Sequence, residues 1–283
     1  MKETVKIAVD AMGGDKSPQK IINGIAISLK ENKNNRFFLY GKKNEIEKCI
    51  LQNSEVKNYC QIIESENIID DNESPLTALK RGKNSSMWKS IESQKEKVSD
   101  ITLSAGNTGA LLVMSRMILK TLEGIDKPAL AGLWPNKKGM NIVLDLGANV
   151  ECNDKNLVDF SKMGSALFKS LFNEDNPKVA LLNIGLEEIK GNETLKKASS
   201  SLKEIKTNDF NFCGYIEGNR IMSGDVDVIV TDGFTGNVAL KTAEGTANFI
   251  TTRLKEALNK FSILLSYKKL NAFKNKLDPR KYN

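Results

Sequence analysis

Residues 226–241 read V-D-V-I-V-T-D-G-F-T-G-N-V-A-L-K, and this stretch decides the predicted fold. Its start, residues 226–230, is β-branched and apolar, which is typical of a buried strand, and residues 238–250 have a helical pattern. The turn between them contains Gly233 and Gly236, which let the backbone bend sharply and present bare N–H groups. Because a helix N-terminus carries a partial positive charge, this turn is suited to hold an anion.

A second turn of the same kind lies earlier in the chain. Residues 103–111, L-S-A-G-N-T-G-A-L, match residues 230–238, V-T-D-G-F-T-G-N-V, position by position in residue type. Residues 143–149, V-L-D-L-G-A-N, share the strand and the Gly-small-Asn ending but lack the Thr-Gly pair. A single glycine turn often serves packing alone. Two matching turns together with the third, partly matching turn favour a shared ligand pocket.

Strand–loop–helix units alternate along the rest of the chain. Predicted strands cover residues 5–9, 37–40, 61–64, 100–103, 129–133, 141–146, 178–184 and 211–216, and predicted helices cover residues 19–30, 43–51, 74–80, 157–172 and the stretches up to 122 and from 194. This alternation predicts an α/β fold with a mostly parallel sheet covered by helices on both faces. Since ligands of such sheets bind beyond the carboxyl ends of the strands, we expect the glycine turns to meet there.

Composition narrows the classes of function. A chain of 283 residues fits one large α/β domain or two lobes. Its 42 Lys and Arg against 35 Asp and Glu give a net charge of +7, which suits an acidic partner, an anionic substrate, a membrane surface or no particular partner. The chain contains no histidine, so histidine bases and histidine metal ligands are excluded, and we expect no metal and no cofactor. Neither a dinucleotide nor a Walker motif is present.

The cysteines and the apolar runs indicate a cytoplasmic protein. The four cysteines form no C-x-x-C pair, which is typical of reduced thiols, and no run of apolar residues has the length needed to cross a bilayer. Residues 253–276 alternate apolar side chains with lysines, which favours a helical pair resting on anionic lipid or, equally, a dimerisation hairpin. The cations at residues 80–83 beside Asn-Ser-Ser favour either an acidic partner or a solvated loop.

Seven blocks together resemble one known family. They are A-V-D-A-M-G-G-D, K-N-S-S-M, S-A-G-N-T-G-A, L-D-L-G-A-N-V, L-L-N-I-G, K-G-N-E and T-D-G-F-T-G-N-V-A-L-K, in this order between residue 6 and residue 283. On these blocks the chain is identified as similar to the PlsX-type phosphate acyltransferases. The resemblance implies a fold like that of phosphotransacetylases and isocitrate dehydrogenases. It also implies transfer of an acyl group from acyl carrier protein to inorganic phosphate, for phospholipid synthesis.

The resemblance also implies partners and site residues. It implies a homodimer at the membrane periphery that feeds a glycerol-3-phosphate acyltransferase, with no nucleic acid involved. Lys190 and Asn237 would stabilise charged oxygens, and Asp232 and Asn149 would orient them. The residues that would bind substrate are Gly13, Gly14, Asp15, Ser104, Gly106, Asn107, Thr108, Gly109, Gly147, Gly233, Thr235 and Gly236. Carrier protein would contact Lys80, Arg81 and Lys83, and the membrane would contact Phe261, Ile263, Leu264 and Leu265.

Two departures from the family pattern leave alternatives open. Family members usually continue past the position of Asn283, so we expect a truncated chain with a catalytic domain over residues 1–250 and a shortened helical segment over residues 251–283. In addition, E-G-N-R at residues 217–220 replaces the commoner E-[GA]-R-D. The alternatives are a transferase that takes acyl-CoA, as phosphotransacetylases do, and a catalytically impaired binding or scaffold protein.

Overall fold

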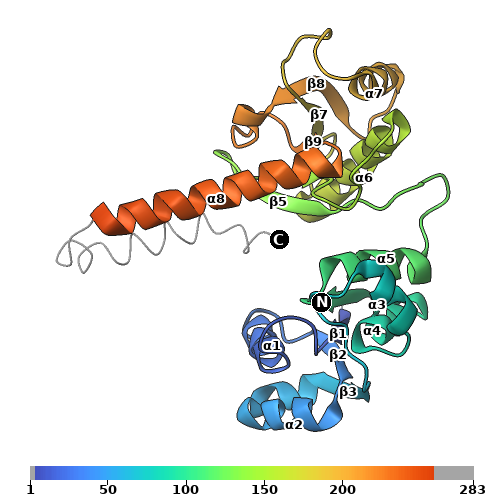
Figure 1. Cartoon of the computed structure of the whole chain (residues 1–283), viewed down its shortest axis with the longest axis vertical. Coiled ribbons are helices and arrows are strands. Elements are labelled where there is room, and N and C mark those ends of the chain that lie inside the picture. Colours follow the sequence, from blue (N-terminus) through green and yellow to red (C-terminus); the bar gives the residue numbers. More distant parts are fainter. Residues whose placement is uncertain (1–3, 258–283) are drawn as a thin grey trace. The chain divides into compact units, whose positions relative to one another are not determined.

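The computed structural model describes residues 4–257 (Figure 1). It divides into two compact units, unit 1 over Met1–Leu122 and unit 2 over Glu123–Asn283. The predicted catalytic domain, residues 1–250, covers both units up to a point inside helix α8 (Gly233–Ala257). The predicted domain division therefore stays a prediction, and residues 258–283 lie outside the described residues.

Unit 1 is built on a four-stranded sheet in the order β3-β2-β1-β4. The strands are β1 (Lys6–Asp10), β2 (Arg36–Gly41), β3 (Cys60–Glu64) and β4 (Ile101–Ser104), and all the pairs are parallel. The helices are α1 (Gln19–Glu31), α2 (Lys43–Gln52), α3 (Pro75–Arg81), α4 (Ser86–Lys95) and α5 (Thr108–Leu119), with a 3-10 turn η1 at Ser54–Tyr59. Parallel strands need crossover connections, and helices provide them here.

Both faces of the unit 1 sheet are covered. Ile22 of α1 and Ile46 of α2 are fully buried against Val9 and Leu39 of the central strands. The opposite face carries α4, which contacts β1, β2 and β4, packs on α5 and shares an apolar cluster with α3 and α5. Successive residues of each strand face the two helical layers in turn, because side chains along a strand point alternately to opposite sides.

Unit 2 contains a five-stranded sheet in the order β5-β6-β9-β7-β8. The strands are β5 (Ala131–Pro135), β6 (Met140–Leu144), β7 (Lys178–Asn183), β8 (Asn211–Glu217) and β9 (Val228–Val230). Edge strand β5 runs antiparallel to β6, and the other pairs are parallel. The helices are α6 (Asp154–Phe172), α7 (Glu193–Glu204) and α8, with a 3-10 turn η2 at Gly218–Arg220.

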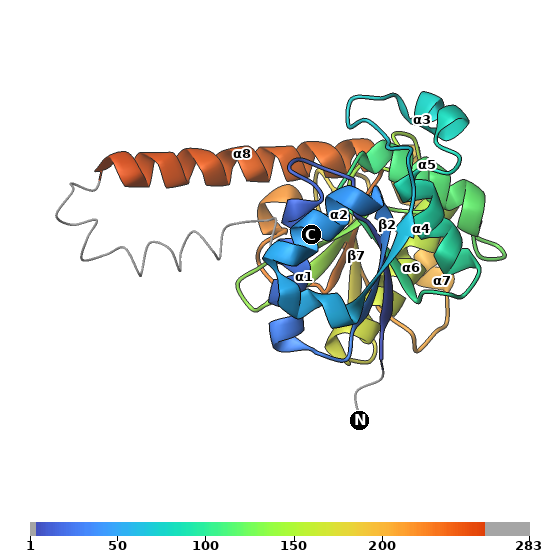
Figure 2. The same cartoon turned by 90° about the horizontal axis from the view of Figure 1, so that it is seen from below.

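Alternation along the strands divides the core of unit 2 into two layers. Val228 and Val230 belong to the layer under α6 and α7, whereas Ile229 belongs to the layer under α8. Figures 1 and 2 show α8 continuing well past the sheet of its own unit. The predicted α/β fold with a mostly parallel sheet and helices on both faces is confirmed in each unit.

The predicted strands are all present, and the differences concern one additional helix and the helix boundaries. Helix α4 was not predicted as a helix; its N-cap is Ser85, whose Oγ accepts a hydrogen bond from the Trp88 N–H. Helix α8 begins at Gly233 instead of residue 238, so most of the predicted turn is the first turn of a helix. The predicted helical pair is represented only by the end of α8, because the rest lies outside the described residues.

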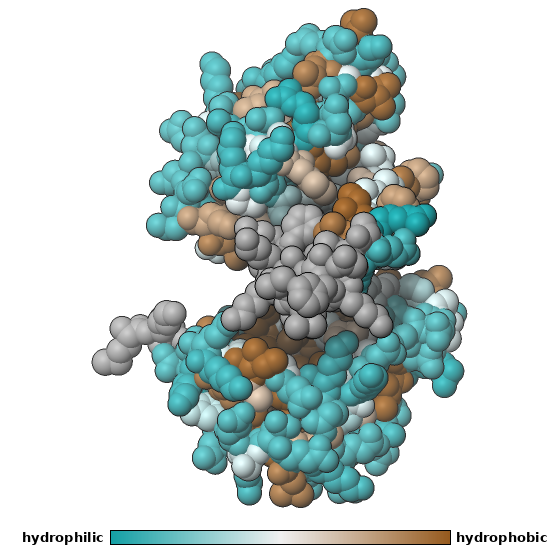
Figure 3. All heavy atoms as spheres, turned by 90° about the vertical axis from the view of Figure 1, so that its left-hand side faces the viewer, coloured by the Kyte–Doolittle hydropathy of each residue, from teal (hydrophilic) through white to brown (hydrophobic). Residues whose placement is uncertain are grey.

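No membrane-spanning helix is found in the part of the chain that the structure describes. None of its helices combines the length and the apolar character that a membrane crossing requires. On the face drawn in Figure 3 the described surface is mostly hydrophilic, with separate apolar patches. Scattered apolar side chains of this kind are ordinary on a protein surface.

Candidate functional site

A buried carboxylate organises the loop after β6. Asp145 is completely buried, and its Oδ1 accepts hydrogen bonds from the backbone N–H groups of Leu130, Gly147 and Ala148 at 2.9–3.1 Å. Its Oδ2 accepts from the backbone N–H of Asn149 at 2.8 Å and from the Asn149 side-chain amide at 2.7 Å. Because these five donors satisfy the buried carboxyl group, they hold the loop in one conformation.

The N-terminus of α8 is capped by the carboxylate that precedes it. Asp232 Oδ1 accepts from the Thr235 N–H at 2.8 Å, and its Oδ2 accepts from the Thr235 hydroxyl at 2.9 Å. Aspartate is among the preferred N-cap residues, and its charge complements the helix dipole. The predicted anion-holding turn thus contains an anion that belongs to the chain itself.

The glycines of this turn are needed for close packing. The Gly233 N–H donates to the Asn149 carbonyl at 2.8 Å, and the Gly236 N–H donates to the Asp232 carbonyl at 2.9 Å. A Cβ at Gly233 would lie 2.6 Å from the Asn149 carbonyl oxygen, and one at Gly236 would lie 1.9 Å from the Asp145 carbonyl oxygen. The backbone N–H groups of Gly233, Thr235 and Gly236, all predicted phosphate ligands, are therefore paired within the protein.

The loop after β7 approaches the same edge of the sheet. Asn183 ends β7, and its amide donates to the Lys190 carbonyl at 3.3 Å while its oxygen accepts from the Ile184 N–H. Gly191 has φ +87°, and a Cβ there would lie 2.5 Å from Asn183 Oδ1, so glycine is required. Asn192 then caps α7 by accepting from the Leu195 N–H at 2.9 Å.

The two predicted oxyanion-stabilising residues have free side chains. Lys190 is exposed, and its ammonium has no ion-pair partner among residues 4–257. Asn237 is exposed in the first turns of α8 and lies against the loop after β6, since a Cβ at Gly147 would be 3.5 Å from the Asn237 Cβ. Its amide likewise has no partner within the described part of the chain. Both groups are available to a ligand.

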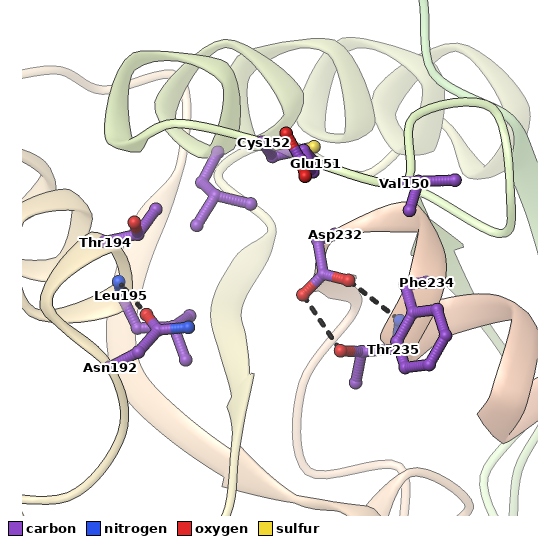
Figure 4. Close-up of a pocket in the computed structure, with 10 residues that line it drawn as sticks. Val150, Glu151, Cys152, Asn192, Thr194, Leu195, Asp232, Phe234 and Thr235 are labelled. Atoms are coloured by element: carbon purple, nitrogen blue, oxygen red, sulfur yellow. Dashed lines mark hydrogen bonds between the residues drawn. The ribbon is translucent and has the colours of Figure 1, made fainter.

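A pocket of about 450 Å³ opens where the three loops of unit 2 meet (Figure 4). Its wall includes Asp232 and Thr235, both predicted site residues, and Cys152, Asn192 and Thr194, which were not predicted. Figure 4 shows Asn192 and Thr194 on one side and Asp232 with Thr235 on the other. Within unit 2 the predicted meeting of the turns at the carboxyl ends of the strands is therefore observed.

Unit 1 repeats the arrangement with another buried aspartate. Asp10, 2% exposed at the end of β1, accepts from the Ser104 hydroxyl at 2.7 Å, and Ser104 Oγ accepts from the Gly106 N–H at 3.2 Å. A Cβ at Gly13 would lie 2.6 Å from Asp10 Oδ2 and 2.8 Å from the Gly106 nitrogen. The turn after β1 and the turn after β4 are thus in direct contact.

The two arrangements correspond in register. Asp10 lies opposite Ser104 in the pairing of β1 with β4. Just beyond the ends of β6 and β9, the backbone N–H of Asp145 donates to the Thr231 carbonyl at 3.0 Å. Ser104 and Thr231 occupy equivalent positions in the two matching turns of the sequence. The repeated turn is therefore part of a larger repeated motif, in which a buried aspartate ends the neighbouring strand β1 or directly follows the neighbouring strand β6.

The buried Asp10 makes a pH-dependent contribution to stability. Burial raises the pKa of Asp10 above its ordinary value of 3.8, although hydrogen bonds from the Ser104 hydroxyl and from the backbone act in the opposite direction. The folded state therefore binds the proton more tightly than the unfolded state, so this stability is present below the unfolded pKa and is lost as pH rises through the folded pKa.

We expect Asp10→Asn to reduce this loss, because the amide cannot ionise. The measurement is the unfolding free energy of both proteins from pH 4 to pH 8, followed by the fluorescence of Trp88 in a Trp134→Phe background. The unfolding free energy of the variant, minus that of the parent, should increase as pH rises. A constant difference across this range would contradict the expectation, and Asp15→Asn at an exposed position is the control.

Other predicted residues of unit 1 have structural partners. The Asn107 side chain caps α5 by accepting from the Ala110 N–H, and its amide donates to the carbonyls of Asp70, Asp71 and Glu73 at 2.8–3.2 Å. Asn107 is thus occupied in holding the segment before α3. Asp15 and Thr108 are exposed. Gly14, in the turn after β1, has a φ of +82°, a backbone conformation that favours glycine.

The predicted carrier-contact residues are exposed around the end of α3. Lys80 and Arg81 lie in the last turn of that helix, and Lys83 follows it. Arg81 is 3.7 Å from Glu73, in an ion pair that leaves its own side chain 78% exposed. The contact with a carrier protein stays a prediction, as does the meeting of the unit 1 and unit 2 turns at one phosphate site.

Comparisons with known proteins agree on the family. A family model described as "Fatty acid synthesis protein" matches residues 5–283. The "Phosphate acyltransferase" of Pelagibacter ubique (strain HTCC1062) is 58% identical over 288 residues, covering 100% of this chain and 86% of that protein. The protein of the same name from Paramagnetospirillum magneticum is 40% identical and is covered to 82%.

Solved structures agree on the fold. The "EutD phosphotransacetylase from Staphylococcus aureus" matches with a TM-score of 0.61 and 15% identity, over 87% of this chain and 83% of that one. A phosphotransacetylase from Streptococcus pyogenes matches with a TM-score of 0.60 and 14% identity, over 86% and 82% of the two chains. At these identities the likeness concerns the fold alone, and the predicted phosphotransacetylase-like fold is confirmed. On the sequence comparisons, the chain belongs to the phosphate acyltransferase family.

Proposed function

We propose that this chain transfers an acyl group from the thioester of acyl carrier protein to inorganic phosphate, giving acyl phosphate and the free carrier thiol. The observation that carries the proposal is the 58% identity to a phosphate acyltransferase over the whole chain. The match to a family described by fatty acid synthesis supports an acyl substrate. The free lysine and amide at the carboxyl edge of the unit 2 sheet support an anionic reaction centre.

The reaction fits a chain without histidine. A phosphate oxygen attacks the thioester carbonyl carbon, a C–O bond forms, and the carbonyl oxygen becomes an oxyanion. The C–S bond then breaks, and the leaving thiolate takes the proton that monohydrogen phosphate carried. Because phosphate supplies both the nucleophile and this proton, no protein base is needed. The protein contributes by holding the two reactants together and by stabilising the oxyanion.

The residues of unit 2 divide between these tasks. Lys190 supplies a mobile positive charge, and Asn237 supplies an amide donor, for the charged oxygens of phosphate or of the tetrahedral intermediate. Asp145 acts indirectly, since its hydrogen bonds fix the loop at residues 147–149 against α8. Asp232 and Asn149 complete that support, because the Gly233 N–H bonds to Asn149 and Asp232 caps the helix that carries Asn237.

The assay supplies acyl carrier protein thioester and phosphate and measures the release of carrier thiol. We expect release that depends on phosphate and yields acyl phosphate. An acyl-CoA thioester with the same acyl group is the second donor, and a higher kcat/KM for it would favour phosphotransacetylase-like chemistry. Binding of the carrier protein without phosphate-dependent release, under conditions in which a family relative turns over, would favour a binding protein instead.

Charge reversal at α3 tests the contact with the acidic carrier. We expect Lys80→Glu with Lys83→Glu to raise the KM for acyl carrier protein about tenfold at low salt, because opposite charges steer association. The KM for acyl-pantetheine, which lacks the protein, should not change. Lys206→Glu, at an exposed position after α7, is the matched control. A KM that rises equally for both donors would place these lysines at the thioester instead.

The proposal also covers how the chain assembles and where it acts. The outer half of α8 carries Phe249, 62% exposed, and Ile250, 46% exposed, which supports a homodimer through this helix. We further propose peripheral contact with anionic lipid, and delivery of the product to a glycerol-3-phosphate acyltransferase. The residues named for membrane contact, Phe261, Ile263, Leu264 and Leu265, lie outside the described residues.

A further inference from the structure

The lining of the pocket beside Asp232 lacks the positive charge that a phosphate needs. Its ten lining residues contain the acids Glu151 and Asp232 and no lysine or arginine. Both oxygens of Asp232 already accept hydrogen bonds from Thr235. An anion placed here would face two carboxylates and no cation of the lining, and the neighbouring Lys127 ammonium is bonded to the Glu151 carbonyl at 2.8 Å, so the pocket is better suited to a neutral ligand.

The lining is divided between apolar and polar side chains. Val150, Leu157, Leu195 and Phe234 supply apolar surface, and Phe234 is 63% exposed. The polar side contains unused donors, since the Thr194 hydroxyl and the Asn192 Nδ2 form no hydrogen bond within the described residues. A ligand that fits must therefore offer both apolar groups and hydrogen-bond acceptors.

On this lining, and resting on the proposed function, we propose that the pocket binds the pantetheine arm of the acyl donor. Pantetheine is a neutral chain that alternates amide groups with methylene groups and has a geminal dimethyl group. Its amide carbonyls would accept from Asn192 and Thr194, and its apolar segments would pack on Phe234 and Leu195. A volume of about 450 Å³ lies within the range of small-molecule sites.

The acyl chain suits this pocket less well. A hydrocarbon chain would cover the free donors of Asn192 and Thr194 without pairing them, and burying unpaired polar groups costs free energy. The pantetheine arm also ends at the thioester sulfur, so its binding beside Asp232 brings the thioester toward the loops that carry Lys190 and Asn237. The pocket thus determines where the scissile bond lies along the edge of the sheet.

Cys152 makes the pocket accessible to a chemical test. Cys152 lines it, whereas Cys213 is exposed on β8 outside it, and burial raises the pKa of both thiols. The full chain is alkylated with iodoacetamide, with and without S-methyl pantetheine, and both cysteines are quantified by mass spectrometry. We expect the probe to slow alkylation of Cys152 severalfold and saturably and to leave Cys213 unchanged. Equal rates at Cys152 with and without the probe would contradict the proposal.

A kinetic test uses the free hydroxyl of Thr194. We expect Thr194→Val to raise the KM for acyl-pantetheine about three- to tenfold, the loss of one hydrogen bond, while the KM for phosphate does not change. Thr252→Val, at an exposed position of α8, is the matched control. An unchanged KM for acyl-pantetheine, or equal increases for both substrates, would overturn the assignment.

These tests separate the two proposals. Protection of Cys152 requires binding alone, so it is observed even if the chain has no transfer activity. Phosphate-dependent transfer without protection, and without an effect of Thr194→Val, would reject the pantetheine pocket and leave the proposed function in place.

Discussion

Replacing Lys190 by alanine is expected to lower kcat for phosphate-dependent thiol release by about 10²–10³, the usual cost of removing one group that stabilises developing charge. The unfolding free energy should change by less than about 0.5 kcal/mol, because Lys190 is exposed and its ammonium has no ion-pair partner among the described residues. Turnover and urea denaturation are measured on the same preparations. The difference between the two effects is what identifies a catalytic lysine.

Matched variants show whether the position or only the charge matters. Lys206→Ala removes an exposed lysine of the same unit and should leave turnover within about twofold of the parent. Lys190→Arg keeps the charge but changes its shape, and it should recover part of the lost rate. If Lys190→Ala lowered stability and turnover in proportion, the lysine would have a structural role and the catalytic assignment would fail.

Alanine at Gly236 and alanine at Gly245 should have opposite effects, although both glycines lie in α8. A Cβ at Gly236 would lie 1.9 Å from the Asp145 carbonyl oxygen, so the loop or the helix must move, at a cost of about 3 kcal/mol. A Cβ at Gly245 meets nothing within 4 Å and removes the entropy that glycine costs inside a helix. Gly245→Ala should therefore stabilise the protein by about 0.5–1 kcal/mol.

Unfolding of unit 2 can be followed by itself. Trp134 of β5 is its tryptophan and Trp88 of α4 is that of unit 1, so a Trp88→Phe background leaves Trp134 as the reporter. The urea midpoints of Gly236→Ala and Gly245→Ala are compared in that background. Similar midpoints would show that the glycine at 236 is not required for the packing of α8 on the loop after β6.

Much of the fold follows from local sequence signals. Every predicted strand is present because short β-branched runs such as V-I-V of β9 have to be buried on both faces between parallel neighbours. Helix α4 was missed since its sequence, S-M-W-K-S-I-E-S-Q-K, contains three serines. Burial of Met87, Trp88 and Ile91 in one cluster with apolar residues of α3 and α5 outweighs that weak propensity.

The site was predicted in part, because residue type does not show which groups are already paired. The glycine turns were found, yet the chain itself uses the N–H groups of Gly233 and Thr235 and the amide of Asn107. Asp145 is not among the predicted site residues, although an aspartate before Gly-Ala-Asn and directly after a buried strand is a signal for such a role. Hydrogen-bond pairing across the fold, rather than spacing along the chain, separates supporting residues from free ones.

Helix α8 has two ends with different surroundings. Its first turn forms a wall of the pocket, and its 25 residues span about 37 Å at 1.5 Å per residue. Its far end, with Arg253 paired to Glu256 at 2.9 Å, stands beyond the sheet. A continuous helix is stiff, so a partner bound to the far end of α8 also fixes the orientation in which Phe234 and Asn237 meet an incoming thioester. A break in the helix near its middle would remove this constraint and leave the residues of the pocket unchanged.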